Sequence, residues 1–462
     1  MNHTKPIEKQ FAKFVIPSMF TMLLAGFYEI VDGFFVGRAL GDVGLAAINI
    51  AWPLAALILA IGTGVGIGGS VIMSTFRGKG DLQQAKAAEG TTISLLALIA
   101  VCLTVILLLC ARPLLIFLGA QGQTLELGLT YIRVIFAGTA LQMFGTGLTP
   151  LLRNHGKSFL VMIIMVAGLI TNIVLDALFI MVFQWGIFGA AFATVLAQGV
   201  TAVGGLLGIF LQKKENRPAL KDLKPRWNFV GESIKIGLSP FGLSFSPSLI
   251  VIFCNWQCLR YGGEVAVAAY SVIAYVLAPA QNLMQGVGDG IQPLISFCKG
   301  GELYKSMRIL IRKAVLLVLL ISVVLFVAMI PGSWMLPIIF GVSSEAAAIV
   351  EHAMLIFSIA FPLIGLARLF SAYFYAVKES RFSTLLVYLD PIVLTPLFVF
   401  TLPLVLDLDG VWMAIPAAQG VLALVAVVLF LVFQKRIPSK NLKPVKVPST
   451  HAPKVLRAVE QE

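Results

Sequence analysis

The sequence predicts an all-α membrane protein whose twelve transmembrane helices form two six-helix bundles. Three observations support this prediction: an apolar composition, a series of long apolar runs and an internal repeat. Hydrophobic residues make up 59% of the chain and charged residues only 12%, whereas soluble domains carry about 25% charged residues. The composition therefore excludes a soluble globular chain.

The apolar runs define the predicted helices, because a transmembrane helix needs about 20 apolar residues. Twelve runs reach this length, at residues 11–37, 45–73, 91–111, 127–151, 159–182, 188–211, 232–258, 265–297, 311–331, 346–376, 382–405 and 410–433. No small-residue cleavage site follows a short apolar core near the N-terminus, so we expect the first run to stay in the membrane. The five cysteines show no metal-like or redox spacing and are predicted to pack between helices.

The distribution of Lys and Arg predicts the orientation of the chain. With the N-terminus inside the cell, 29 of the 34 basic residues fall in inside segments. Only Arg38, Arg112 and Arg260 fall in outside loops, and Arg133 and Arg368 lie within apolar runs. We therefore expect both termini to be cytoplasmic, and we read the net charge of +12 as this topology signal and not as a nucleic-acid surface.

The internal repeat divides the chain into two halves. GDVGLAA at 41–47 corresponds to GEVAVAA at 263–269, and GVG at 64–66 to GVG at 286–288, both with an offset of 222 residues. Because six helices return the chain to the same side, the halves should be related by a pseudo-two-fold axis along the membrane normal. We expect an N-terminal bundle at 1–211, a cytoplasmic linker at 212–231, a C-terminal bundle at 232–437 and a disordered tail at 438–462.

Acidic residues inside the apolar runs are the first functional candidates. A charged side chain near the bilayer centre costs about 2.5–3.5 kcal/mol on insertion scales, so such residues mark functional sites by default. Glu29 and Asp32 lie in the first run and Asp176 lies in the fifth at a similar depth, with Asn172 one helical turn before it. We expect these groups to face one cavity, where they could hold a proton or a small cation. Glu29 could instead pair with Arg133 or with a polar group on a neighbouring helix.

The second half has a different set of intramembrane charges. Asp289, Arg368 and Asp390 all fall in the inner half of the membrane, and an ion pair of Arg368 with Asp390 or Asp289 is expected to brace or gate the cytoplasmic side. Polar, methionine and aromatic side chains could line an amphipathic substrate cavity, although each could equally serve in helix packing. These cavity candidates are Met22, Gln142, Met143, Tyr275, Gln281, Asn282, Met284 and Gln285.

Over residues 8–435 the chain resembles the multidrug and toxic compound extrusion (MATE) family, in its MepA-like and DinF-like branch. The resemblance rests on the two halves, on VDGFFVGRALG at the end of the first run and on TNIVLDALFI in the fifth. It implies a cation site formed by Asp32, Asn172, Asp176 and Thr194, and a bending point at Pro17. The NorM-like branch adds acids in the seventh and tenth runs, where this chain has only Glu351 near an edge.

The resemblance implies a secondary active exporter, not an enzyme, that moves amphipathic and often cationic compounds out of a bacterial cell through the inner membrane. It would act as a monomer by antiport with H⁺ or Na⁺, without a cofactor and without a metal other than a coupling Na⁺. Two alternatives remain open. A lipid-linked oligosaccharide flippase of related architecture would need a strongly cationic cavity, and a passive channel would not couple two gradients.

Overall fold

The computed structural model describes residues 5–213 and 215–437; the side chains of residues 5–9, 27–34, 36–43 and 45 lie outside this description. Every regular element in the described part of the chain is helical. This confirms the predicted all-α class and follows from the composition, since a helix satisfies its own backbone hydrogen bonds inside lipid. By length and composition, eight described helices can cross a membrane, or ten when two bent pairs are each joined.

The long helix α1 (Lys5–Gly78) must fold back on itself. At 1.5 Å per residue, the 60 residues from Val15 to Thr75 would extend about 90 Å if straight. Val15 nevertheless packs against Gly290 and Thr75 packs against Gly300, two positions only ten residues apart. Helix α1 therefore contributes two crossings, as the first two apolar runs predict.

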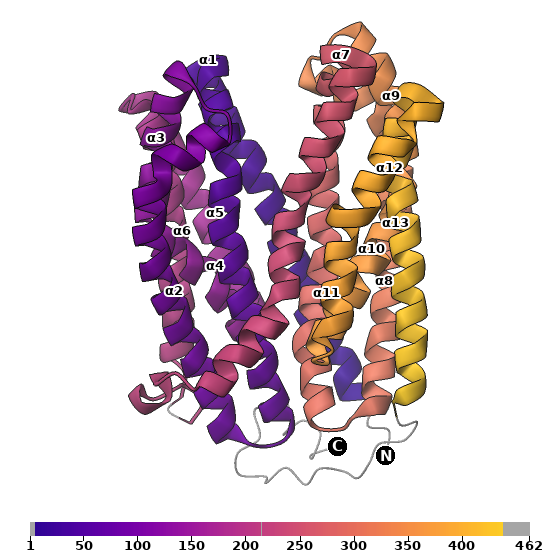
Figure 1. Ribbon diagram of the computed structural model, residues 1–462. Coiled ribbons are helices and arrows are strands. Elements are labelled where there is room, and N and C mark those ends of the chain that lie inside the picture. Colours follow the sequence, from indigo (N-terminus) through magenta and orange to yellow (C-terminus); the bar gives the residue numbers. More distant parts are fainter. Residues whose placement is uncertain (1–4, 214, 438–462) are drawn as a thin grey trace.

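Helix α7 (Trp227–Gly300) also contains two crossings. Its helical geometry breaks at Gly263, with φ 64° and ψ −162°, a region of backbone space that favours glycine because no Cβ is present. Figure 1 shows α7 rising along the molecule and returning from its upper end. Counting α1 and α7 twice brings the ten crossings to the twelve that the sequence predicts.

The remaining helices complete two groups. The N-terminal group contains α1, α2 (Leu82–Phe117), the bent pair α3 (Gly122–Ala137) and α4 (Thr139–Asn154), α5 (Ser158–Asp176) with the π-helical turn η1 (Ala177–Val182), and α6 (Gly186–Phe210). The C-terminal group contains α7, α8 (Tyr304–Phe340), the bent pair α9 (Ser344–Ser358) and α10 (Ala360–Ala376), α11 (Ser380–Leu389) with the π-helical turn η3 (Asp390–Leu394), α12 (Thr395–Thr401) and α13 (Pro403–Arg436).

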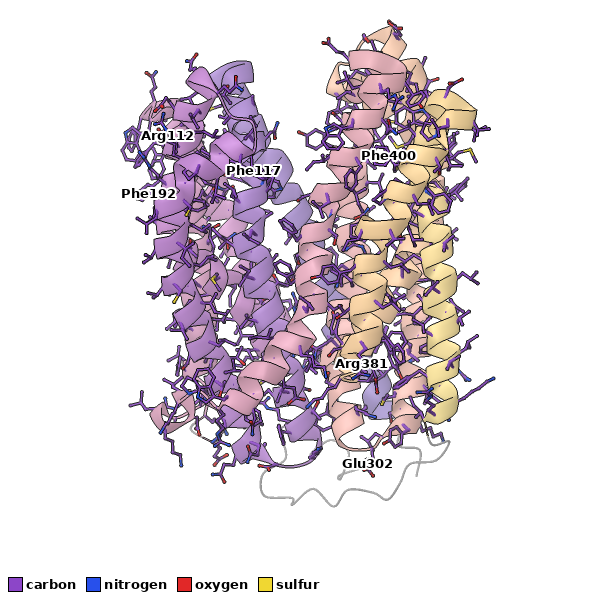
Figure 2. The ribbon with its side chains drawn as sticks, viewed as in Figure 1. Arg112, Phe117, Phe192, Glu302, Arg381 and Phe400 are labelled. Carbon is purple, nitrogen blue, oxygen red and sulfur yellow. The ribbon has the colours of Figure 1, made fainter. Side chains whose placement is uncertain are left out.

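The two groups of helices approach each other at one end of the molecule and diverge at the other (Figure 1). Helix α1 begins and α13 ends at the end where the groups meet, which we call the terminal end; the opposite end is the far end. Side chains mark the two ends in Figure 2, with Glu302 at the terminal end and Arg112 and Phe400 toward the far end.

Glycines of the internal repeat lie where the two groups touch. A Cβ on Gly64 would stand 2.8 Å from the carbonyl oxygen of Gly237, and a Cβ on Gly286 would stand 2.6 Å from the Cα of Met19. Both distances are too short for a side chain, so the backbones approach each other as they do at small-residue contacts of membrane helices. The repeated GVG segments therefore serve the same purpose in both halves, which is close contact between the groups.

The linker between the groups is bound to α2. It contains the short helix η2 (Leu220–Leu223), and the carbonyl oxygen of Leu223 accepts a hydrogen bond from the Ser94 hydroxyl. Arg226 donates from Nη1 to Oε1 of Gln84 at 2.7 Å and from its backbone N–H to the Thr91 hydroxyl at 3.3 Å. The linker is thus attached to the N-terminal group immediately before α7 begins.

Candidate functional site

The acid and amide of α5 lie in the interior of the N-terminal group. Asn172 and Asp176 are fully buried, with side chains 0% exposed, and α1 packs directly against α5. Asp176 is the last α-helical residue before the π-helical turn η1. Such turns interrupt the regular hydrogen-bond pattern of a helix and occur often at functional sites.

Asn172 has polar capacity that its described surroundings do not use. Both amide atoms of its side chain are buried, and no described residue forms a hydrogen bond with either. A buried polar group without a partner costs about 1–3 kcal/mol, so natural proteins keep few of them. The amide is therefore suited to bind a group that enters the site.

The rest of the predicted cation site is described only in part. Glu29 and Asp32 belong to α1, but their side chains lie outside the described residues, so their distance from Asp176 stays untested. Thr194 on α6 is half-buried and donates its hydroxyl proton to the carbonyl oxygen of Ala190 at 3.0 Å. Pro17 is a buried residue inside α1, where its missing N–H removes one helical hydrogen bond.

Three of the cavity candidates are packing residues. Gln142, Met143 and Met284 are all buried, and Gln142 donates from Nε2 to the carbonyl oxygen of Ile135 at 2.7 Å. Among the others, Tyr275 is 47% exposed and stacks on Phe340 with ring centres 5.6 Å apart. The half-buried candidates are Met22, Gln281, Asn282 and Gln285.

A cavity opens within the C-terminal group, between α7, α9, α10, α11 and α13. Its space, including the part open to solvent, is about 880 Å³. Apolar side chains such as Ile250, Leu277 and Phe357 form most of the wall. Polar groups from four elements also line it: Gln281, Arg368, Asp390 and Gln419.

The structure corrects the predicted ion pair of Arg368. Arg368 donates from Nη2 to Oε1 of Gln281 at 2.7 Å, and it forms no ion pair with any described residue. Asp390 accepts a hydrogen bond from Thr395 on one carboxylate oxygen and from Gln419 on the other, each at 2.7 Å. The prediction was wrong in its partners because neutral side chains near each charge supply the closer hydrogen bonds.

Asp289 has a cationic partner from the other group of helices. The Nη1 of Arg153, at the end of α4, lies 2.9 Å from Oδ2 of Asp289 on α7, and both side chains are at most 4% exposed. Gln285 donates to Oδ1 of the same carboxylate at 2.9 Å, and Tyr375 contacts it at 3.3 Å. This buried, hydrogen-bonded pair joins the two groups at the terminal end.

A second buried cluster surrounds His155, next to this pair. Arg77 donates from Nη2 to Nδ1 of His155 at 2.7 Å, and Nε2 lies 2.6 Å from Oε1 of Glu89. These contacts fit a neutral imidazole that accepts at Nδ1 and donates at Nε2. Burial lowers the pKa of His155, and the positive charge of Arg77 lowers it further, although Glu89 acts in the opposite direction.

The sequence model of the MatE family matches residues 17–178 and 243–398, which together exceed half of the chain. The chain belongs to the MATE family. Each matched segment of this MATE protein carries one of the two acids at a π-helical turn, Asp176 in the first and Asp390 in the second.

Curated relatives of this MATE chain extend over almost its whole length. Multidrug export protein MepA of Staphylococcus saprophyticus is 24% identical over 436 residues, which cover 93% of this chain and 95% of the relative. Multidrug export protein MepA of Staphylococcus aureus strain MRSA252 is 25% identical over 444 residues, which cover 94% and 95% of the two chains.

Solved MATE structures share the fold. A structure described as the outward-facing conformation of a multidrug resistance MATE family transporter matches with a TM-score of 0.89 and 23% identity, over 95% of this chain and 99% of that chain. A MATE crystal structure in complex with MaL6 matches with the same TM-score, identity and coverage. At this level of identity the likeness establishes the fold of the chain and nothing further.

Sequence reasoning missed two features of this MATE protein, the Arg153–Asp289 pair and the His155 cluster. The count of basic residues places Arg153 only in an inside segment, and no pattern in the sequence distinguishes His155. The signal that could have found the pair is depth, because Arg153 directly follows the apolar run 127–151 and Asp289 lies near the end of the run 265–297, at the same side of the membrane. No local pattern indicates the partners of His155, since Glu89 is 66 residues away in the chain.

Proposed function

We propose that this MATE protein is a secondary active multidrug exporter of the bacterial inner membrane, acting as a monomer. It exports amphipathic, often cationic compounds by antiport with H⁺ or Na⁺. The observation that carries the proposal is that Asn172 and Asp176 are both fully buried on α5, which is a mainly apolar helix. The names of the Staphylococcus relatives, multidrug export proteins, support the substrate class.

The proposed orientation follows from the basic residues of the terminal end. With both termini in the cytoplasm, the far end, where the groups diverge in Figure 1, faces the outside of the cell. The Arg153–Asp289 pair then closes the cytoplasmic side. Alternating access is a rocking of the two bundles, proposed as residues 1–211 and 232–437, during which this pair separates and the far end closes.

Coupling requires that the ion and the drug prefer different states. In our proposal, H⁺ or Na⁺ enters from outside and binds at Asp32, Asn172, Asp176 and Thr194. Glu29 contributes either to this ion site or to binding of the drug. Binding favours release of the drug outward, and the ion then leaves into the cytoplasm. One elementary charge that moves across the membrane gains about 2.3 kcal/mol per 100 mV. Together with the concentration gradient of the coupling ion, this energy drives accumulation of the drug outside the cell.

Dye efflux from proteoliposomes tests this proposal. Asp32→Asn and Asp176→Asn variants should insert normally and lose efflux of a cationic dye driven by an imposed pH or sodium gradient. Comparing a pH gradient with and without sodium identifies the coupling ion. Efflux like that of the wild type in both variants would refute the role of the acids, and counterflow of labelled substrate without net current separates a transporter from a channel.

A further inference from the structure

The cavity of the C-terminal group holds two opposite charges that do not pair with each other. Arg368 and Asp390 both line it, and no ion pair within 4 Å joins Arg368 to any described residue. Each charge is instead held by neutral groups: Arg368 by Gln281, and Asp390 by Thr395 and Gln419. A charged side chain at membrane depth is costly. Because no direct ion pair joins these two charges, each can bind a charged group of a molecule that enters the cavity.

The positions of these charges are fixed by the fold. Asp390 begins the π-helical turn η3, and both of its oxygens accept hydrogen bonds, so the carboxylate is held in one orientation. Arg368 is half-buried on α10 and uses one nitrogen for Gln281. Since a guanidinium carries five N–H donors, it retains donors for a carboxylate, which it binds well through paired hydrogen bonds.

We propose that this cavity is a binding site for zwitterionic amphipathic compounds, with Arg368 binding a carboxylate and Asp390 a cationic amine. The apolar wall contacts the ring system that lies between the carboxylate and the amine of the bound compound. The mainly apolar lining with a few fixed polar groups is typical of small-molecule sites. The inference rests on the proposed export function and adds a substrate class to it. It also gives Arg368 a binding partner in place of the ion pair that the sequence predicts.

A matched pair of dyes tests the site by equilibrium binding. Rhodamine 110 is a zwitterion at neutral pH, and rhodamine 123 is its methyl ester, a cation without the free carboxylate. Binding to purified protein in detergent is followed by fluorescence polarisation, with no gradient present. Arg368→Gln should weaken rhodamine 110 binding about tenfold or more, which corresponds to one lost charged hydrogen bond, and should change rhodamine 123 binding less than threefold.

Two further variants keep the test decisive. Arg368→Lys retains the charge and should lose only part of the rhodamine 110 affinity, which covers the case in which Arg368→Gln fails to fold. Arg133→Gln makes the same exchange at an exposed arginine of α3 and should leave both affinities unchanged. Asp390→Asn should weaken both dyes, because both carry the cationic ring system.

The proposal is overturned if Arg368→Gln weakens both dyes equally, which would indicate a packing role, or if the ratio of the two affinities does not change. Absence of rhodamine 110 binding to the wild type would overturn it as well. These outcomes do not decide the antiport proposal, which depends on gradient-driven efflux of a cationic dye and on Asp32 and Asp176.

Discussion

Arg153 and Asp289 join the two groups of helices through a buried ion pair in which Nη1 and Oδ2 are 2.9 Å apart. The two residues are 136 positions apart in the sequence, and each lies on a different group. A second contact between the groups lies beside them, where Asn154 donates to Oε1 of Gln292 at 3.1 Å. In an alternating-access cycle these contacts must break each time the terminal end opens.

Neutralising one partner of this pair should therefore favour the state in which the terminal end is open and the far end is closed. Asp289→Asn leaves Arg153 buried without its counter-charge, and removing one partner of a buried pair costs about 3–5 kcal/mol. The cost falls on the state in which the terminal end is closed. Spin labels can be attached to cysteines introduced at Arg112 and Glu351 in a background without other cysteines. Double electron–electron resonance should then show shorter distances across the far end in Asp289→Asn than in the wild type.

Glu232→Gln is the control for this experiment. Glu232 pairs with Lys378 at 2.9 Å, but both side chains are partly exposed, and such pairs contribute about 0–1 kcal/mol. Its distance distribution should match that of the wild type. An Asp289→Asn distribution that also matches the wild type would show that the pair does not hold the terminal end closed.

The contact between Gly64 and Gly237 should tolerate no side chain. Gly64→Ala places a methyl group 2.8 Å from the Gly237 carbonyl oxygen, and overpacking of this kind costs about 1–3 kcal/mol. We expect reduced efflux and a lower melting temperature. Gly231→Ala is the matched control, because no atom lies within 4 Å of its added Cβ; equal effects of the two changes would count against a close contact at Gly64.

The His155 cluster predicts a pH dependence of stability. The pKa of His155 is lowered in the folded protein, chiefly by burial and then by Arg77. The contribution of neutral His155 to the stability of the folded protein is therefore fully present above the ordinary pKa of about 6.5. It is lost as the pH falls toward the lower folded value, since the unfolded chain then binds the proton more readily. Melting temperatures measured from pH 7.5 to 5 should fall more steeply in the wild type than in His155→Gln.

His352→Gln provides the comparison for that series. His352 lies 3.0 Å from Asp409, but both side chains are more than half exposed, so its removal should leave the slope with pH almost unchanged. A His155→Gln protein with the same slope as the wild type would exclude His155 as the titrating group.

Asn172 should show opposite effects on stability and function. Asn172→Leu removes a buried amide that has no hydrogen-bond partner among the described residues, so we expect a gain of about 1–2 kcal/mol in the ion-free protein together with a loss of gradient-driven efflux. Asn154→Leu is the control, because that amide donates to Pro150 and Gln292 and its loss should destabilise. A destabilised Asn172→Leu would mean that the amide is satisfied in the native protein.

The sequence is sufficient to predict the helical fold, whereas for the site it supplies candidate residues only. Run lengths, the basic residues and the repeat predict the helices, because lipid imposes the same length and apolarity on every crossing. Asn172 and Asp176 can be selected as candidates because a polar residue in an apolar run is conspicuous; the structure shows that both are buried, and their role in ion binding stays a prediction. The partners of Arg153 and Arg368 cannot be predicted from the sequence, since they depend on the rotation and depth of helices that are far apart in the chain.

The linker bound to α2 restricts how the bundles can move. Leu223 and Arg226 attach the linker to the N-terminal group through hydrogen bonds to α2. The linker is therefore not a flexible connection between the two groups. If the C-terminal group moves relative to the N-terminal group, we expect the bend to fall after Arg226, in the first turns of α7.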